Sequence, residues 1–347
     1  MYCEHTVGVV IPAYNEVGFI GDVINDIPDF VDRIFVIEDC SSDGTWQEIL
    51  SQANNMSNTE NNKCISIKNV KEQTYSDRIE QYKRIGLVDA IKHDENLGLG
   101  GALKTGYLAA LKHGADIVAK VDGDGQMDLD YLPKLLDPIV ENKADYSKAN
   151  RLMYEDYRQE MPKFRLLGNS ILTFLTKVAS GYWKMMDPQN GYTAISNQAL
   201  ENVGIEDMYE YYGYCNDLLV KLNARGMRIA DVAIPAIYGD EESSIEYTTY
   251  IRKVSWMLLK NFFWRLKTKY LVLDFHPLAL FYLFGVILTA LGIAGGGWTI
   301  YSSAVFNDSL FLRGTVSLLV FSLGCLFLMF AMLFDMQTNE EKEVQLY

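Results

Sequence analysis

Two carboxylates and an amide stand at alternate positions in the stretch VAKVDGDGQMD, residues 118–128. They are Asp122, Asp124 and Gln126, and they follow a short apolar run that predicts a strand. Alternate residues of an extended chain point to the same side, so we expect the three side chains to lie together. Such oxygen ligands suit Mg²⁺ or Mn²⁺. An ion with few protein ligands completes its shell with water and substrate phosphates, so the motif favours a diphosphate ligand.

A calcium loop and a plain acidic turn are the alternatives to a shared metal site in this stretch. A calcium loop fails, because counting from Asp122 the positions that need Gly and Glu hold Met127 and Pro133. An acidic turn exposed to solvent is a simpler source of an isolated D-x-D pair. The surrounding motifs must decide between this turn and a metal site.

The composition narrows the classes of partner. The chain has 347 residues, enough for one large or two modest domains. Its formal net charge of -14 argues against nucleic acid as a partner, since the phosphate backbone is also negative. Five scattered cysteines without a C-x-x-C pair predict neither a disulfide framework nor a zinc site. The first residues lack the basic region of a signal peptide, and no cleaved leader is expected.

Two segments late in the chain predict transmembrane helices. Residues 277–301 and 314–334 are free of charged side chains and long enough to span a bilayer. The link between them holds one basic residue, Arg313, whereas the segment before them is rich in basic residues. These are Arg252, Lys253, Lys260, Arg265, Lys267 and Lys269. By the positive-inside rule we expect a multi-pass protein whose N-terminal domain and tail, residues 337–347, are cytoplasmic.

The basic segment itself mixes Trp and Phe with Lys and Arg, in YIRKVSWMLLKNFFWRLKTKY. This composition is typical of an interfacial helix that lies on a membrane. The alternative is an ordinary amphipathic helix packed on its own domain. The sequence leaves both open.

The first 240 residues alternate apolar, β-branched runs with helical stretches that start near Val17 and Gly100. Runs that are apolar throughout predict an α/β sheet, mostly parallel and covered on both faces. The predicted strands are residues 7–13, 33–39, 87–93 and 116–122. A polar stretch at about 52–84 is expected to be a surface insertion.

Ligands of open α/β sheets bind beyond the carboxyl ends of the strands. The predicted strand ends are followed by PAYNE, by EDCSSDGT and by NLGLGGALKTGY. The last stretch is not a P-loop, because no glycine immediately precedes Lys104, nor a dinucleotide fingerprint, because Leu103 replaces the third glycine. It predicts a tight turn that opens a helix, with Lys104 either binding a donor molecule or lying at the surface.

The motifs VVIPAYNE, IEDCSSDGT, NLGLGGALKTGY and VDGDGQMD, in this order and spacing, resemble the family-2 glycosyltransferases with the GT-A fold. With its two apolar segments, the chain is similar to the polyprenyl-phosphate (dolichyl-phosphate) glycosyltransferases, which include dolichol-phosphate mannose and glucose synthases. The resemblance implies a GT-A domain at 1–240, a juxtamembrane segment at 241–273, two transmembrane helices at 274–336 and the tail.

The implied reaction is metal-dependent and inverting. It moves a hexose-type sugar from a UDP- or GDP-linked donor to a polyprenyl or dolichyl monophosphate, giving a lipid-linked monosaccharide for glycan assembly. The same resemblance assigns roles to individual residues. Those implied to line the donor pocket, with Lys104 as a further candidate, are Pro12, Tyr14, Glu16, Asp39 and Asp122.

The remaining roles concern the metal and the acceptor. Asp124 and Gln126, with Asp122, are implied to hold Mg²⁺ or Mn²⁺ on the diphosphate. Arg151 and Arg165 match basic positions that face donor or acceptor phosphates, and we assign them to the acceptor phosphate. Asp187, in DPQNGYTAIS, matches an aspartate of the family and joins Asp122 and Asp124 as a catalytic residue.

One loop departs from the family's pattern. Many relatives carry Arg and Lys after the strand that corresponds to RGMRIADVAIPA, whereas here the loop reads IYGDEESSI and residues 240–242 are acidic. Acceptor binding through this loop is therefore in doubt, which leaves Arg151 and Arg165 to do more of it.

Two other functions stay open. A membrane glycosyltransferase that extends a polysaccharide or a lipid-linked oligosaccharide would share the sheet and the acidic motif, but a processive synthase should carry Q-x-x-R-W near the membrane. The nearest stretch, NFFWRL, does not match. A catalytically silent scaffold is hard to reconcile with the intact Asp122, Asp124 and Gln126. The sequence leaves open the sugar, the nucleotide, the prenyl chain and the oligomeric state, a homo-oligomer included.

Overall fold

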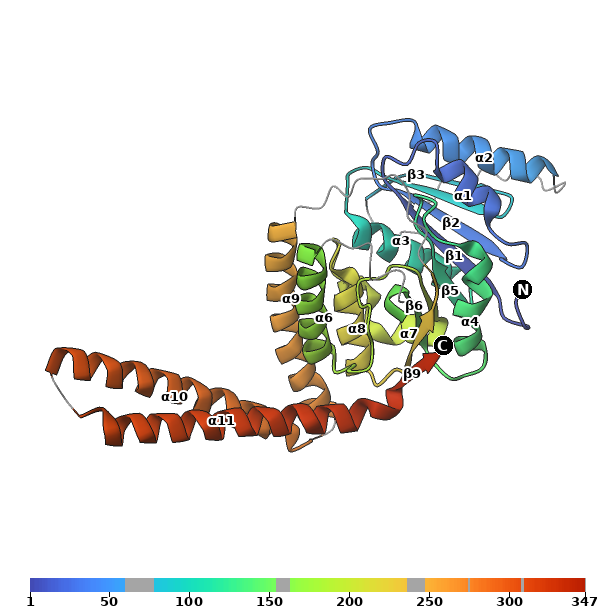
Figure 1. Cartoon of the computed structure of the whole chain (residues 1–347). Coiled ribbons are helices and arrows are strands. Elements are labelled where there is room, and N and C mark those ends of the chain that lie inside the picture. Colours follow the sequence, from blue (N-terminus) through green and yellow to red (C-terminus); the bar gives the residue numbers. More distant parts are fainter. Residues whose placement is uncertain (60–77, 154–162, 236–246, 274, 307–308, 347) are drawn as a thin grey trace.

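The computed structural model describes residues 1–59, 78–153, 163–235, 247–273, 275–306 and 309–346 (Figure 1). The described strands form one sheet in the order β3-β4-β2-β1-β5-β7-β6-β8-β9. They are β1 (Val7–Ala13), β2 (Arg33–Glu38), β3 (Ile79–Ile85), β4 (Val88–His93), β5 (Ile117–Lys120), β6 (Tyr146–Asn150), β7 (Thr193–Ser196), β8 (Ile229–Ala233) and β9 (Glu343–Leu346). Most neighbouring strands are parallel, and β3 and β7 supply the antiparallel pairs. The predicted α/β fold with a mostly parallel sheet is confirmed.

Helices cover both faces of this sheet (Figure 1). Those packed on its core are α1 (Ile20–Asp26), α2 (Thr45–Thr59), α3 (Leu99–Lys112), α4 (Leu132–Val140), α7 (Asn197–Val203) and α8 (Tyr214–Ala224). The other long helices of the described residues are α6 (Lys163–Ser180), α9 (Tyr247–Lys267), α10 (Leu278–Phe306) and α11 (Leu310–Asn339).

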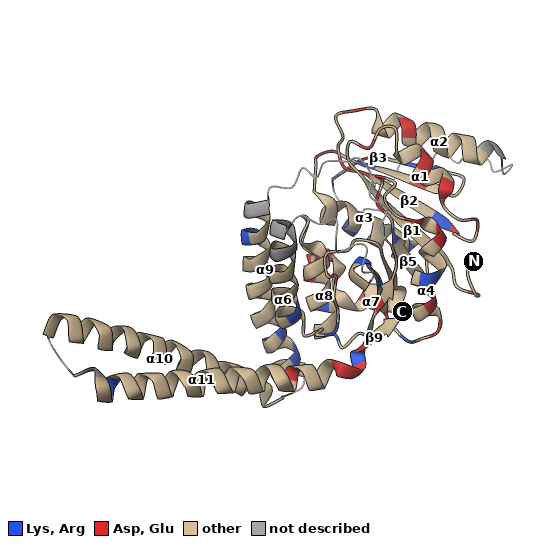
Figure 2. Ribbon diagram, in the orientation of Figure 1, with Lys and Arg blue, Asp and Glu red and all other residues tan. Residues whose placement is uncertain are grey.

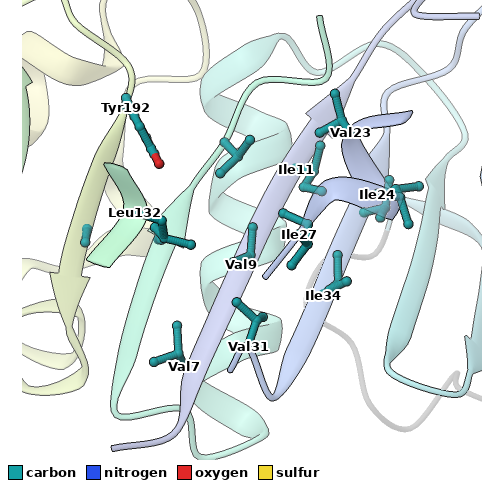
Figure 3. Close-up of a cluster of buried hydrophobic side chains, with 14 of the residues drawn as sticks. Val7, Val9, Ile11, Val23, Ile24, Ile27, Val31, Ile34, Leu132 and Tyr192 are labelled. Carbon is teal, nitrogen blue, oxygen red and sulfur yellow. The ribbon is translucent and has the colours of Figure 1, made fainter. Parts of the chain in front are cut away.

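The two hydrophobic cores follow from the alternation of side chains along the strands. Val9 and Ile11 of β1 pack with Ile24 of α1 on one face, as Figure 3 shows. Val10, between them, is buried on the other face with Leu103 of α3. Successive side chains of a strand point to opposite faces, so a continuously apolar strand feeds both cores at once.

The polar stretch at about 52–84 is only partly the insertion that we expected. Residues 52–59 continue α2, and Ala53 is buried. Residues 79–85 form β3, an edge strand that pairs antiparallel with β4. Because an edge strand tolerates polar side chains, its composition resembled that of a loop. Residues 60–77 lie outside the described part of the chain.

Helices α10 and α11 project from the α/β domain as an antiparallel hairpin (Figure 1). Both are long and apolar enough to span a membrane. Figure 2 shows how few charged residues they carry. Arg313 lies near the start of α11 and Asp335 near its end. The helices approach closely at Gly292, where a Cβ would lie 2.5 Å from the Cα of Phe321.

A cluster of buried polar side chains joins the hairpin to the α/β domain. Arg265 of α9 is fully buried and forms a two-pronged ion pair with Asp335 of α11, at 2.9 and 2.8 Å. Lys269 donates to Asn223 Oδ1 of α8 at 2.6 Å and to Asn339 Oδ1 of α11 at 2.5 Å. Charged groups out of water are stable only when they are paired and hydrogen-bonded, so these contacts fix how α8, α9 and α11 meet.

Two of the six basic residues before the hairpin therefore do not face solvent. They are Arg265 and Lys269, and burial lowers the pKa of Lys269 to about 6. A neutral amine still has the hydrogens for two asparagine oxygens. The positive charge at the surface of this segment comes from Arg252, Lys253, Lys260 and Lys267.

Helix α9 has two apolar faces. Val254 and Leu258 are buried in a small core with residues of α6 and α8. Trp256, Leu259 and Phe263 are exposed. The helix thus packs on its own domain, as one of the two alternatives expected, and also presents apolar side chains outward.

The chain returns to the sheet after the hairpin. Residues 340–342 form a 3-10 turn, and β9 pairs in parallel with β8. Residues 337–347, which we expected to be a tail, thus end α11 and provide an edge strand, with Tyr347 outside the described residues. Both ends of the hairpin consequently lie on the side of the α/β domain.

We predict that Asp335→Leu destabilises the protein by about 3–5 kcal/mol, because it leaves the buried Arg265 guanidinium without a counter-ion. The measurement is the thermal denaturation midpoint of the detergent-solubilised chain. Adding Arg265→Met should restore much of the loss, since the remaining charge is then gone. Lys267→Met, at an exposed position of the same helix, is the control. If Asp335→Leu alone leaves the denaturation midpoint unchanged, the Arg265–Asp335 ion pair does not have the role assigned to it.

Candidate active site

The carboxyl ends of three adjacent parallel strands, β2, β1 and β5, bring the predicted site loops together. The loops after β1 and β2 are joined by hydrogen bonds. Asn15 N–H donates to Ser41 Oγ at 3.0 Å, and Ser42 N–H donates back to Asn15 Oδ1 at 2.9 Å. Glu16 N–H donates to Thr45 Oγ1 at 2.9 Å. These bonds hold the two loops as one rigid rim.

The acidic motif after β5 lies against the first of these loops. A Cβ on Gly123 would stand 3.2 Å from the carbonyl oxygen of Pro12 and 3.4 Å from Cγ of Glu16. A side chain at this position would thus be tightly packed, and its neighbours would have to shift by a few tenths of an ångström. Pro12 is buried within β1, whereas Tyr14 is exposed at the rim. The structure thus brings Pro12 and Glu16 beside the D-x-D turn.

Asp39 is buried and held by neighbours that the sequence did not single out. Its Oδ1 accepts from Leu97 N–H at 2.9 Å and lies 2.7 Å from His93 Nδ1. His93 Nε2 lies 2.9 Å from Thr105 Oγ1. His93 thus bridges Asp39 and the Thr105 hydroxyl, which also donates to the carbonyl oxygen of Gly101 at 3.3 Å. This relay fixes the orientation of the Asp39 carboxylate.

A signal for His93 was present in the sequence. It closes a predicted strand that is otherwise mostly apolar, at the edge where ligands are expected, yet a lone histidine there is not specific. Only the distance to Asp39, 54 positions away in the chain, shows what it does.

Lys120 is a second site residue that the sequence did not single out. Its side chain is buried, and its Nζ forms an ion pair with Oδ1 of Asp122. The pair neutralises one charge of the D-x-D motif and fixes the rotamer of Asp122. Oδ1 of Asp122 is therefore engaged by the protein itself.

The motif fits a divalent cation that is shared with substrate. Gln126 N–H donates to Asp124 Oδ1 at 2.9 Å, which folds the turn and places both side chains on one short segment. The available ligand atoms are carboxylate and amide oxygens, as Mg²⁺ and Mn²⁺ prefer. Within the described residues, no group of three or more His, Cys, Asp or Glu side chains could hold an ion. The ion would therefore depend on phosphate oxygens and water for the rest of its shell.

The loop before β7 brings Asp187 to the same edge of the sheet. In the sheet register Lys120 of β5 and Lys148 of β6 both lie beside Thr193, the first residue of β7. The carboxyl ends of β5 and β6 and the residues that lead into β7 therefore meet. Asp187, in that loop, and Arg151, directly after β6, fall on this edge.

Arg151 and Asp187 form a two-pronged ion pair. Arg151 Nε donates to Asp187 Oδ2 at 2.8 Å, and Nη2 to Oδ1 at 3.3 Å. Lys148 Nζ contacts the backbone oxygen of Asp187. Burial by itself raises the pKa of Asp187, but the positive charges of Arg151 and Lys148 outweigh it and hold this pKa below its ordinary value. Asp187 is thus an anion that orients the guanidinium.

Of three further predictions, only the one for Lys104 falls on a described side chain. Lys104 forms an ion pair with Glu210 at 3.1 Å, so in this structure it is bound to the segment after α7. Arg165 falls in the first turn of α6, and its side chain lies outside the described part of the chain. The acidic residues 240–242 also lie outside it.

Comparison with known proteins finds a family and relatives of similar sequence. The profile of the family "Glycosyl transferase family 2" matches residues 8–204. The chain is 31% identical over 231 residues to the UDP-N-acetylglucosamine–dolichyl-phosphate N-acetylglucosaminyltransferase of Methanococcus voltae, an alignment that covers 66% of this chain and 85% of the relative. It is 23% identical to the undecaprenyl-phosphate mannosyltransferase of Micrococcus luteus, over 65% of this chain and 81% of that one.

Solved structures agree on the fold. Glucosyl-3-phosphoglycerate synthase from Mycobacterium tuberculosis, in complex with uridine diphosphate, superposes with a TM-score of 0.51 at 20% sequence identity. The superposition covers 75% of this chain and 80% of that one.

We predict that His93→Leu weakens the binding of UDP or GDP by roughly tenfold, because Asp39 loses a hydrogen bond to its charged oxygen. Isothermal titration calorimetry with each nucleotide measures the change. Thr105→Val should produce a smaller loss, since it removes only the outer partner. His113→Leu, at a partly exposed histidine outside this relay, should bind like the parent. Unchanged affinity for both nucleotides in His93→Leu would show that nucleotide binding does not depend on the relay.

Proposed function

Because the chain belongs to glycosyl transferase family 2 and is therefore a glycosyltransferase, we propose that it transfers a sugar from a nucleotide-sugar to a membrane polyprenyl (dolichyl) monophosphate. The product is a lipid-linked monosaccharide. The donor is UDP-linked in this proposal, since the relative with 31% identity is named for UDP-N-acetylglucosamine and dolichyl phosphate. The acceptor class is also supported by the relative named for undecaprenyl phosphate.

One observation carries the proposal: the domain that holds the proposed site is joined to the apolar hairpin by buried contacts. The D-x-D turn and the Asp39 relay lie at the sheet, and Arg265 and Asp335 tie that sheet's helices to the hairpin. An enzyme with a soluble acceptor has no need of this connection. An acceptor whose phosphate is fixed at the headgroup level requires it, because the site must be held at that level.

The outward face of α9 supports the placement at the membrane. Trp256, Leu259 and Phe263 are exposed there, and Phe174 of the neighbouring α6 is exposed as well. Aromatic side chains flanked by Lys and Arg are typical of an interfacial helix. We propose that this face rests on the bilayer, and that the exposed basic residues place the α/β domain on the cytoplasmic side.

The chemistry requires little of the protein at the attacking atom. An acceptor phosphate has a second pKa of about 6, so its oxygen is already an anion near neutral pH, and no general base is needed. This oxygen forms a bond to the anomeric carbon of the sugar while the bond from that carbon to the nucleoside diphosphate breaks. Attack opposite the leaving group inverts the configuration.

The chain's residues bind and orient the two substrates. Asp39, fixed by His93, is proposed to face the nucleoside, and the rigid loops after β1 and β2 close around it. Asp124, Gln126 and Oδ2 of Asp122 would hold a divalent ion that neutralises the charge of the departing diphosphate. We assign Arg151, oriented by Asp187, to the acceptor phosphate, because a guanidinium recognises phosphate oxygens in a fixed plane.

The test is transfer of labelled sugar into lipid. Membranes that contain the protein are incubated with UDP-N-acetylglucosamine, other UDP-sugars and GDP-mannose, each with a polyprenyl phosphate and Mg²⁺ or Mn²⁺. We expect one donor to give an organic-soluble product that releases the sugar on mild acid treatment. Label in polymer, or in extended lipid-linked oligosaccharide, would instead support a chain-extending enzyme. No transfer with any donor would contradict the proposal.

We predict that Asp124→Asn lowers this transfer by more than a hundredfold while the protein stays folded and membrane-bound, because an ion would lose a charged ligand at a solvent-facing strand end. The initial rate of lipid labelling measures the effect. Asp130→Asn, an exposed carboxylate on the same segment, is the matched control and should keep the parental rate. Activity of Asp124→Asn within a few-fold of the parent would remove Asp124 from the metal site.

A further inference from the structure

The strand that follows the hairpin contacts the loop that carries Asp187. Glu343, the first residue of β9, accepts hydrogen bonds from three successive backbone amides. Trp183 N–H donates to Oε1 at 2.7 Å, and Lys184 and Met185 donate to Oε2 at 2.7 and 3.0 Å. Gln345 of the same strand donates to the carbonyl of Lys184 at 3.0 Å. Burial raises the pKa of Glu343 to about 7 despite the three amides that converge on it, so above that pH the clamp is charge-assisted and stronger than neutral hydrogen bonds.

The next amide of this loop is held by the neighbouring strand. Met186 N–H donates to Oδ2 of Asp231 in β8 at 3.0 Å, and the same oxygen accepts from Asn150 at 2.7 Å. Four successive amides, residues 183–186, thus end on two acidic side chains of adjacent strands. Asp187 comes immediately after them. Its position, and with it the orientation of Arg151, depends on these anchors.

The position of Glu343 depends in turn on the hairpin. Only the turn at residues 340–342 separates β9 from α11. The last residue of α11, Asn339, bonds to Asn223 of α8 at 3.0 Å and to Lys269. The clamp therefore begins at the buried polar cluster that fixes the end of the second apolar helix.

We propose that Glu343 is a positioning residue for the acceptor half of the active site, and that β9 transmits the position of the membrane hairpin to Arg151 through the loop that carries Asp187. This inference rests on the proposed function for its acceptor. In this arrangement only the acceptor half of the site depends on the hairpin. The nucleotide half, at Asp39 and the loops after β1 and β2, shares none of these contacts.

The test compares Glu343→Gln with the parent in the full-length, detergent-solubilised chain. Glutamine has nearly the same volume, but its NH₂ group donates where a carboxylate oxygen accepted. At least one of the three amides therefore loses its acceptor. We expect a ten- to hundredfold rise in the KM for polyprenyl phosphate, a smaller change in kcat and an unchanged Kd for UDP. Glu341→Gln, an exposed glutamate in the adjacent turn, should match the parent in all three.

A double-mutant cycle with Arg151→Ala separates positioning from general destabilisation. If Glu343 acts through Arg151, Glu343→Gln should add little to the KM of the Arg151→Ala variant, whereas independent effects would multiply. Multiplying effects, an unchanged KM in Glu343→Gln, or an equal loss of UDP affinity would each overturn the proposal. If Glu343→Gln does not fold, Glu343→Asp keeps the charge on a shorter side chain and is put through the same cycle.

A measurement without substrate keeps this test separate from the proposed function. Amide hydrogen exchange of residues 183–187 should accelerate in Glu343→Gln and stay parental in Glu341→Gln. Parental protection in Glu343→Gln would overturn the clamp even if the parent is active. A parent that transfers no sugar, with accelerated exchange in the variant, would instead reject the proposed function and leave the clamp standing.

Discussion

The sheet of the α/β domain receives an edge strand from beyond the apolar hairpin, and much of the structure follows from this constraint. Because β9 pairs with β8, the chain must leave the domain, run out and back, and return to the same body. A membrane anchor attached by a flexible linker would leave the height and tilt of the site undefined. Here the hairpin is bound at the start, through α9, and at the end, through β9.

The buried polar cluster enforces that geometry where the hairpin meets the domain. Arg265 and Asp335 form a buried ion pair, and beside it Asn223, Lys269 and Asn339 are hydrogen-bonded to one another. Such a cluster adds little net stability compared with an apolar core, but each member is costly to leave unpaired. It therefore selects one docking arrangement of the hairpin over others. The apolar contacts of the same helices are less directional.

The proposed active site divides into two halves with different supports. The half after β1 and β2 is fixed by contacts within the first part of the chain, including the relay from Thr105 through His93 to Asp39. The half that contains Arg151 and Asp187 is fixed by β8 and β9, near the end of the chain. The acidic turn after β5 lies between them, where the donor diphosphate and the acceptor phosphate meet in the proposed reaction. This division suits a reaction that joins a soluble donor to a membrane-bound acceptor.

The sequence by itself determined what is encoded locally. Apolar strands, the two apolar helices and the oxygen-rich D-x-D-x-Q turn each show within about 25 residues, because periodicity and composition are local properties. The edge strand β3 and the short strands β6 and β7 carry polar residues and were not recognisable in this way. Tertiary structure alone decided that Asp187 pairs with Arg151, that Lys120 neutralises Asp122, that His93 orients Asp39 and that Glu343 reaches the loop before Asp187. Most of these pairs lie tens to more than a hundred positions apart, and only the order of the strands in the sheet brings their side chains within hydrogen-bonding distance.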